Sequence, residues 1–329
     1  MVRTRRNGDP VPRHLEAGFS LVEVMAALVI LAIAMTAVFA TFASQQKSFT
    51  VQNRVAEMQQ NLRQAAEYLS RDIRLAGYGI PDNVTVPDGV IAAGITSIRS
   101  IYAKDNTTGP DQIYVLFMFD MDGNQPPTTD NGAGVPSNAG SITVPGAAGF
   151  LATGGELVLV TDGTAADLYE TSAASGTTLT LGGGFNYNSG HSKSYPAGSP
   201  PATVAKARFV RYYIDTVTDP AHPTLMVDRM AGAAPQPLAD DIEDMQFDYG
   251  LDTSTPTDGV VDLWTPNPTN AQMPLIRQVR LQFVARTRIP EAGWTETRPA
   301  LGNHAAGATP DGYRRRTYDI VVDVRNSGV

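Results

Sequence analysis

The chain has 329 residues and a formal net charge of −8, from 25 basic and 33 acidic side chains, and it contains no cysteine. An acidic surface argues against nucleic acid or an anionic membrane surface as the partner of the soluble part. Without cysteine there is neither a disulfide bond nor thiol chemistry, so cysteine usage does not identify the compartment.

The first segment, residues 1–18, is polar and has the composition of a targeting leader peptide. It carries four arginines against two acidic residues, and it contains two prolines. An excess of arginine directly before an apolar span keeps the N-terminal side in the cytoplasm and sends the rest of the chain outward. The sequence therefore predicts a single membrane pass with a cytoplasmic N-terminus.

Residues 24–43 form an uncharged apolar run whose hydroxyls are Thr36 and Thr41. As a helix this run would be about 30 Å long, which matches the hydrocarbon core of a bilayer. Two alternatives are a secretory signal peptide cut near Val38-Phe39-Ala40 and a plain membrane anchor. The run is longer than the apolar region of a typical signal peptide, and Glu23 lies at its head, which argues against the first alternative.

Residues 44–76 continue the helix with an amphipathic pattern. Apolar side chains recur at steps of three and four residues, at Val51, Val55, Met58, Leu62, Ala65, Leu69, Ile73 and Ala76. The glycines and proline of residues 77–81 then stop the helix. We therefore expect one long helix within residues 19–80, whose second half packs on a partner.

Residues 18–23, Gly-Phe-Ser-Leu-Val-Glu, resemble the processing signal of type IV pilins and type II secretion pseudopilins. The resemblance implies that a membrane aspartyl protease, the prepilin peptidase, cuts between Gly18 and Phe19. It also implies that Phe19 becomes N-methylphenylalanine and that Glu23 is the fifth mature residue. Before assembly the subunit would reside in the inner membrane, and afterwards in a helical filament of major and minor pilins at the cell surface.

Glu23 is an ionisable group at the head of a membrane span, which makes it a functional candidate. A charge at mid-span costs roughly 2.5 to 3.5 kcal/mol on insertion scales. The positive end of the helix dipole favours a carboxylate at the helix start. Its counter-charge would be an α-amine, either its own or that of Phe19 in a neighbouring subunit, and this pairing would set the register of assembly. The alternative is a capping carboxylate that reaches the headgroups.

Residues 81–329 are rich in Gly, Pro, Thr and Asn, with short β-prone runs between turn clusters. The runs are residues 112–119, 141–144, 156–161, 177–181, 207–217, 224–228, 245–249, 275–286 and 316–325. Loops are expected at residues 128–140, 182–201, 253–270 and 300–312. This composition predicts an α+β fold in which the long N-terminal helix packs on an antiparallel sheet. The exported β-rich region is one elaborated domain or two sub-domains, with residues 182–201 as the boundary.

The resemblance extends into this region. Residues 69–78 are similar to the end of the long helix in PilW-type minor pilins and J-type pseudopilins. Residues 242–250, 258–262, 279–287 and 314–326 are similar to parts of the PilW family. The long soluble region favours a PilW-type minor pilin, which would act in pilus initiation, assembly or at the tip. Residues 85–232 match no family that can be named from the sequence.

We find no catalytic motif, and no enzyme activity is expected. His14 lies in the leader, and His191, His222 and His304 are isolated in loops. No cofactor is expected. Two oxygen-rich groups are weak candidates for calcium, and solvated turn carboxylates are the ordinary explanation. They are Asp120, Asp122 and Asn124, and Asp252, Asp258 and Asp262. The arginines at 314–316 are expected to decorate a strand edge, with a partner-docking patch as the alternative.

Three functions remain. The first is a structural minor-pilin subunit, and the second is a type II secretion pseudopilin of the J type. The third is a membrane-anchored adhesin or binding domain in which the processing signal is coincidental. Co-purification with minor pilins or with secretion pseudopilins distinguishes the first two, and processing at Gly18 distinguishes both from the third.

Overall fold

The computed structural model describes residues 18–81, 84–91, 95–118, 128–136, 139–147, 149–182, 194–198 and 200–326. The chain forms two compact units, Met1–Asn53 and Arg54–Val329. We describe each unit by itself and call them the first and the second unit.

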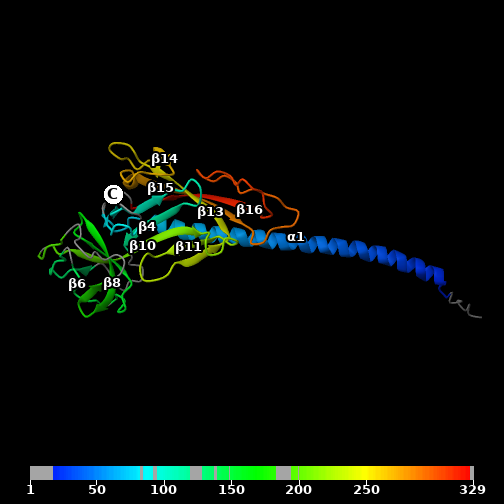
Figure 1. Ribbon diagram of the computed structural model, residues 1–329, viewed down its shortest axis with the longest axis horizontal. Helices are drawn as coiled ribbons and strands as arrows, with labels where there is room; N and C mark the ends of the chain where they lie inside the picture. The colour runs from blue at the N-terminus through cyan, green and yellow to red at the C-terminus, as the bar shows by residue number, and fades with distance from the viewer. Residues whose placement is uncertain are drawn as a thin grey trace, which may run out of the picture. The chain divides into compact units, whose positions relative to one another are not determined.

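Helix α1 spans Leu21–Leu75 and is the long N-terminal helix that the sequence predicts (Figure 1). It contains neither glycine nor proline, the residues least compatible with a helix interior. It ends before Gly77, which has a φ of 81°, a left-handed conformation that glycine adopts without strain. The N–H of Gly77 donates to the carbonyl of Leu116 at 3.0 Å, which fixes the end of the helix to the sheet.

In the second unit, α1 buries one face against the sheets. Its buried residues are Met58, Leu62, Ala65, Ala66, Leu69, Ser70, Asp72 and Ile73. Two amides on the same part of the helix bind backbone carbonyls late in the chain: Gln64 donates to Leu238 at 2.9 Å, and Asn61 donates to Asp240 at 3.0 Å. The amphipathic pattern thus becomes a packed helix, as expected.

A buried hydrogen bond also joins α1 to the sheet. The hydroxyl of Tyr212 donates to Asp72 Oδ2 at 2.6 Å, and Asp72 also contacts Arg71 at 3.3 Å. Burial raises the pKa of Tyr212 well above its ordinary value, and the negative charge of Asp72 raises it further. The tyrosine therefore stays neutral and remains a donor to the buried carboxylate.

The larger sheet follows the order β12-β11-β10-β7-β8-β1-β2, with β4 also paired to β10. Its strands are β1 (Val84–Thr85), β2 (Ser97–Ile98), β3 (Ile101–Lys104), β4 (Gln112–Met118), β5 (Thr128–Thr129), β6 (Ser141–Thr143), β7 (Leu157–Thr161), β8 (Ala166–Ser175), β9 (Thr178–Leu181), β10 (Thr203–Asp215), β11 (Thr224–Asp228) and β12 (Gln236–Asp240). Strand β10 pairs with β7 and β5 over its first residues and with β4 and β11 further on. One sheet therefore continues past residues 182–201.

A smaller sheet has the order β14-β13-β15-β16. Its elements are β13 (Ile242–Leu251), β14 (Leu263–Thr265), the 3-10 helix η1 (Met273–Leu275), β15 (Ile276–Arg286) and β16 (Arg315–Asp323). Strand β14 lies inside residues 253–270, which the sequence predicts as a loop. This short segment becomes a strand because it pairs with β13.

The predicted α+β fold is confirmed, with one correction to the expected antiparallel pairing. Among the described strands, β1 pairs with β8 in parallel, at Val84 with Ala166 and Thr85 with Asp167. The remaining pairs between described strands are antiparallel. A parallel pair needs a long connection between its strands, and residues 86–165 provide one here.

The second unit has three cores. The largest joins the buried face of α1 to β4, β10 and the smaller sheet. The second core fills the end of the larger sheet around β6, β7 and β9, and the third lies around β1, β4 and β8. Strand β4 supplies Ile113, Val115 and Phe117 to the first core and Tyr114 and Leu116 to the third, because successive side chains point to opposite faces.

Candidate functional site

The predicted processing residues meet at the start of α1. A Cβ added at Gly18 would meet nothing within 4 Å, and the side chain of Phe19 is 80% exposed. The carbonyl of Ser20 accepts the N–H groups of Glu23 at 3.0 Å and Val24 at 3.1 Å. Glu23 therefore lies in the first helical turn, at the Ser-x-x-Glu spacing of a capping box and at the positive end of the helix dipole.

The apolar part of α1 is exposed within the first unit. This helix is long and apolar enough to cross a membrane, and its most apolar window is not buried. Thr36 donates to the carbonyl of Ala32 at 2.8 Å and Thr41 to that of Ala37 at 2.9 Å, so both hydroxyls are satisfied within the helix. Exposed large side chains include Leu28, Val29, Ile30, Leu31, Ile33, Val38, Phe39 and Phe42. Such a surface suits lipid or the apolar helices of neighbouring subunits.

Several residues singled out from the sequence lie outside the described part of the chain. They are the rest of the leader, residues 1–17, with His14, the first oxygen-rich group of Asp120, Asp122 and Asn124, and His191. The calcium prediction for that group stays a prediction.

The second oxygen-rich group binds protein groups of its own loop and of β15. Asp252 is fully buried and accepts the N–H of Gly259 at 2.8 Å and Nε of Arg277 at 3.3 Å. Asp258 and Asp262 each accept a backbone N–H of the loop. Within the described ranges, no three acidic or histidine side chains converge as metal ligands. The arginine contact gives Asp252 a cationic partner from the protein itself.

The two described histidines are not isolated, contrary to the expectation from their loops. His304 Nδ1 lies 2.8 Å from Asp244 Oδ2, and its Nε2 lies 3.0 Å from a guanidinium nitrogen of Arg298. This geometry fits a neutral ring that donates to Asp244 and accepts from Arg298. His222 Nδ1 similarly lies 2.8 Å from Asp241. Both rings hold loops to buried carboxylates, Asp244 in β13 and Asp241 just before this strand, which is a structural role.

The arginine run at 314–316 leads into the edge strand β16, as predicted, and Arg316 is exposed there, but Arg315 is buried. Arg315 is 3% exposed and forms two hydrogen bonds to Glu243, at 2.6 and 3.0 Å. It also binds both carboxylate oxygens of Asp311, at 2.7 and 2.5 Å. The hydrogen bond from Arg315 holds the pKa of Asp311 below its ordinary value. Arg315 is therefore the centre of a buried ionic network.

Asp111 is a second buried carboxylate, next to β4, and it ties this strand to the smaller sheet. Its oxygens accept the N–H of Asn106 at 2.7 Å and that of Phe247 at 3.0 Å. Burial raises the pKa of Asp111 to about 7, and the nearby charges of Asp105 and Asp244 raise it further. The two hydrogen bonds oppose this shift but do not cancel it.

We expect this carboxylate to make stability depend on pH. The ordinary aspartate pKa is about 3.9, so the folded chain binds this proton more tightly than the unfolded chain. The favourable contribution is therefore fully present below about pH 4 and is lost as the pH rises through 7, a difference of roughly 3 kcal/mol. Between pH 4 and pH 7, the free energy of unfolding measured by denaturant titration should fall less steeply for Asp111→Asn than for the unchanged chain.

Asp258→Asn replaces an exposed aspartate and serves as the matched control. Its free energy of unfolding should change with pH as steeply as that of the unchanged chain. Equal slopes for all three proteins would contradict the assignment of this pH dependence to Asp111.

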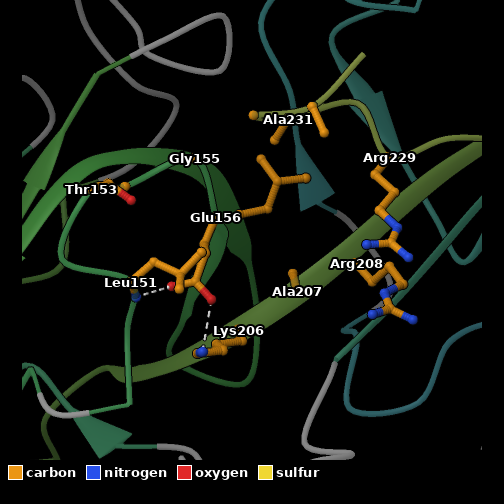
Figure 2. Close-up of a pocket in the computed structure, with 13 residues that line it drawn as sticks. Leu151, Thr153, Gly155, Glu156, Lys206, Ala207, Arg208, Arg229 and Ala231 are labelled. Atoms are coloured by element: carbon orange, nitrogen blue, oxygen red, sulfur yellow. Dashed lines mark hydrogen bonds and ion pairs between the residues drawn. The ribbon is translucent and has the colours of Figure 1, made fainter. Parts of the chain in front are cut away.

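A hollow of about 530 Å³ lies between residues 151–157, β10 and residues 229–233 (Figure 2). On one side, Lys206 Nζ contacts Glu156 at 2.7 Å, and Glu156 also accepts the N–H of Leu151 at 2.6 Å. On the other side lie Arg208 and Arg229. Burial lowers the pKa of Arg208, and the charge of Arg229 lowers it further. The hollow thus has one neutralised ion pair and two neighbouring cations.

Two family models match the chain, one at the predicted processing residues and one over the smaller sheet. Residues 13–39 match the family model described as Prokaryotic N-terminal methylation motif. This matched range contains Gly18, Phe19 and Glu23. Residues 211–326 match that of Type IV Pilus-assembly protein W and include β13, β15 and β16. No curated protein matches the chain. A type IV-like pilin from Thermus thermophilus is 12% identical, covers 82% of this chain and 96% of its own, and has a TM-score of 0.37.

The chain is therefore a type IV pilin-like protein with a prepilin-type N-terminal motif on a long apolar helix. Its similarity to PilW-type minor pilins lies in residues 211–326, the part of the second unit that begins in β10. The matched families are pilus components and not enzymes.

Proposed function

We propose that the chain is a minor-pilin subunit of a type IV pilus, cut by prepilin peptidase between Gly18 and Phe19. The observation that carries this proposal is the exposed apolar part of α1, preceded by the Gly18-Phe19 junction and headed by Glu23. The new N-terminal Phe19 would be methylated. The helix would hold the subunit in the inner membrane, with its N-terminus in the cytoplasm, until assembly.

Assembly would transfer the apolar helix from lipid to neighbouring pilin helices. Burial of apolar surface stabilises such a stack by about 25 cal/mol per Å² relative to water. Glu23 would pair with the α-amine of Phe19 in a neighbouring subunit, because an unpaired charge is costly in an apolar surrounding. This pair would set the axial register, and the second unit would remain outside the helical stack to contact partners in pilus initiation or at the tip.

The test is the mass of the mature N-terminal peptide from cells that contain prepilin peptidase. We expect a peptide that begins at Phe19 and carries one added methyl group. Cells that lack the peptidase provide the control, and there the chain should keep residues 1–18. A mature chain that begins at Thr41 would instead support a secretory signal peptide and would contradict the proposal.

A further inference from the structure

A groove of about 810 Å³ runs in the second unit between the last turns of α1 and strand β16. We call it the arginine groove. Apolar side chains along it are Ala66, Leu75, Tyr318 and Ile320, and the cations beside them are Arg63, Arg71, Arg74 and Arg325. Glu67 is the acidic residue among those that line it. An apolar floor with a cationic rim is therefore present on a chain whose net charge is −8.

Three of these arginines have no ionic partner among the described residues. Arg63, Arg74 and Arg325 are exposed, and among the described residues none of them has an ion pair or a side-chain hydrogen bond. Arg71 differs, because it contacts Asp72 at 3.3 Å. Many other arginines of the second unit are neutralised by carboxylates, as Arg315 is. The groove thus concentrates positive charge that the described part of the chain does not balance.

Ser70 supplies a second, independent observation. Its side chain lines the groove and is 6% exposed, yet its Oγ has no hydrogen-bond partner among the described residues. Leaving a buried hydroxyl without a hydrogen-bond partner is unfavourable. A polar ligand in the groove would remove this cost.

The third observation is the free edge of β16. This strand is last in the order of the smaller sheet and pairs with β15 alone among the described strands. Tyr318 and Ile320 of β16 both line the groove. An unpaired edge offers a row of backbone donors and acceptors to an incoming strand.

We propose that the arginine groove binds an acidic, extended segment of another protein, which adds to β16 as a further strand. Carboxylates of the segment would share the face of Tyr318 and Ile320 and bind Arg63, Arg74 and Arg325, and the side chains between them would point to the opposite face of the sheet. Backbone groups of the segment would pair with β16, and a polar group would reach Ser70.

The dimensions agree with such a ligand. From Arg63 to Arg74 the helix rises by about 16 Å, at about 1.5 Å for each residue. A strand of five residues spans about 17 Å, at about 3.4 Å for each residue. A short segment with acidic residues at alternate positions could therefore reach the arginines at both ends of this stretch.

The probe is a fluorescent seven-residue peptide that alternates glutamate with valine, and binding is measured by anisotropy with the full chain in detergent micelles. We expect saturable binding, together with slower amide exchange in β16 when the peptide is present. A peptide with lysine in place of glutamate should not bind. A peptide methylated on alternate backbone nitrogens should also lose binding, because it cannot pair with the strand edge.

Two variants and one control locate the site. Arg63→Glu combined with Arg74→Glu should raise the dissociation constant about tenfold or more, because it reverses two cations. Ser70→Ala removes an unpartnered hydroxyl, so the fold should be unchanged and peptide affinity should fall about threefold. Arg229→Glu replaces an exposed arginine outside the groove and should leave binding unchanged.

Three outcomes would overturn the proposal: equal binding of the lysine peptide, equal binding by the double variant, or undiminished binding of the methylated peptide. Self-association of the chain that the double variant abolishes, without peptide binding, would instead assign the groove to a second copy. Because the groove consists of residues from the second unit alone, none of these results depends on cleavage at Gly18.

Discussion

Replacing Gly18 by leucine should leave the protein as an uncut precursor in cells that contain prepilin peptidase. Glycine lets a protease approach the backbone closely, and a branched side chain at this position blocks that approach. The substitution should not disturb the fold, because a Cβ at Gly18 would meet nothing within 4 Å and the residue is not in the left-handed region. The intact mass of the protein shows whether residues 1–18 are still attached, and the pilus yield of the same cells shows whether the subunit assembles.

Gly140→Leu is the matched control, since a Cβ at Gly140 also meets nothing within 4 Å. This variant should be cut between Gly18 and Phe19 like the unchanged chain. Normal cutting and piliation of Gly18→Leu would contradict the prepilin hypothesis and would favour a plain membrane anchor whose signal-like residues are coincidental.

The second large effect is expected on stability, from Arg315→Ala. This substitution removes the cation that binds Glu243 and Asp311 and leaves these carboxylates without their main partner. Arg286 lies 3.7 Å from Glu243 and compensates only in part. Breaking a buried ionic pair by removing one partner costs about 3 to 5 kcal/mol. The free energy of unfolding of the full chain in detergent, from denaturant titration, measures the loss.

Arg316→Ala provides the comparison at the adjacent position. Arg316 is exposed, and its guanidinium donates to the carbonyl of Arg315 at 2.9 Å. Its replacement should change stability by less than about 0.5 kcal/mol, as is usual for surface positions. Equal losses for the two variants would show that Arg315 does not act through its two carboxylate partners.

The strands that the sequence predicted correctly are those with a strong local pattern. In β15, Val279, Leu281 and Phe283 are fully buried, and the polar residues between them are not. This alternation is visible in the sequence because the side chains of a strand point to opposite faces in turn. Each of the nine predicted runs overlaps an observed strand.

Strand β8 was missed although it has ten residues. Its sequence, ADLYETSAAS, is rich in small and polar residues and has weak β propensity. Pairing with β7 along one stretch and β9 along another stabilises it, and both pairings depend on the assembled sheet. Strand propensity reflects packing against neighbours, which a local pattern does not contain.

The same distinction applies to the candidate sites. Gly18, Phe19 and Glu23 lie within six consecutive residues, so the sequence alone brings them together. Arg315 and Glu243 are 72 residues apart, and His304 and Asp244 are 60 apart. Their contacts follow from the pairing of β13, β15 and β16 and from the loop before β16. The arginine groove was not predicted from the sequence, because arginines on the polar face of an amphipathic helix have no pattern that marks a binding site.

The contacts of α1 with the end of the chain also determine when the fold can be completed. Gln64 and Asn61 bind carbonyls 174 and 179 residues further on, and the apolar face beside them packs against the smaller sheet. During synthesis, this face emerges long before the strands that cover it. Folds dominated by such distant contacts form slowly, and their uncovered surfaces aggregate readily. We therefore expect the newly made chain to keep this apolar face uncovered, and open to aggregation, until its last strand arrives.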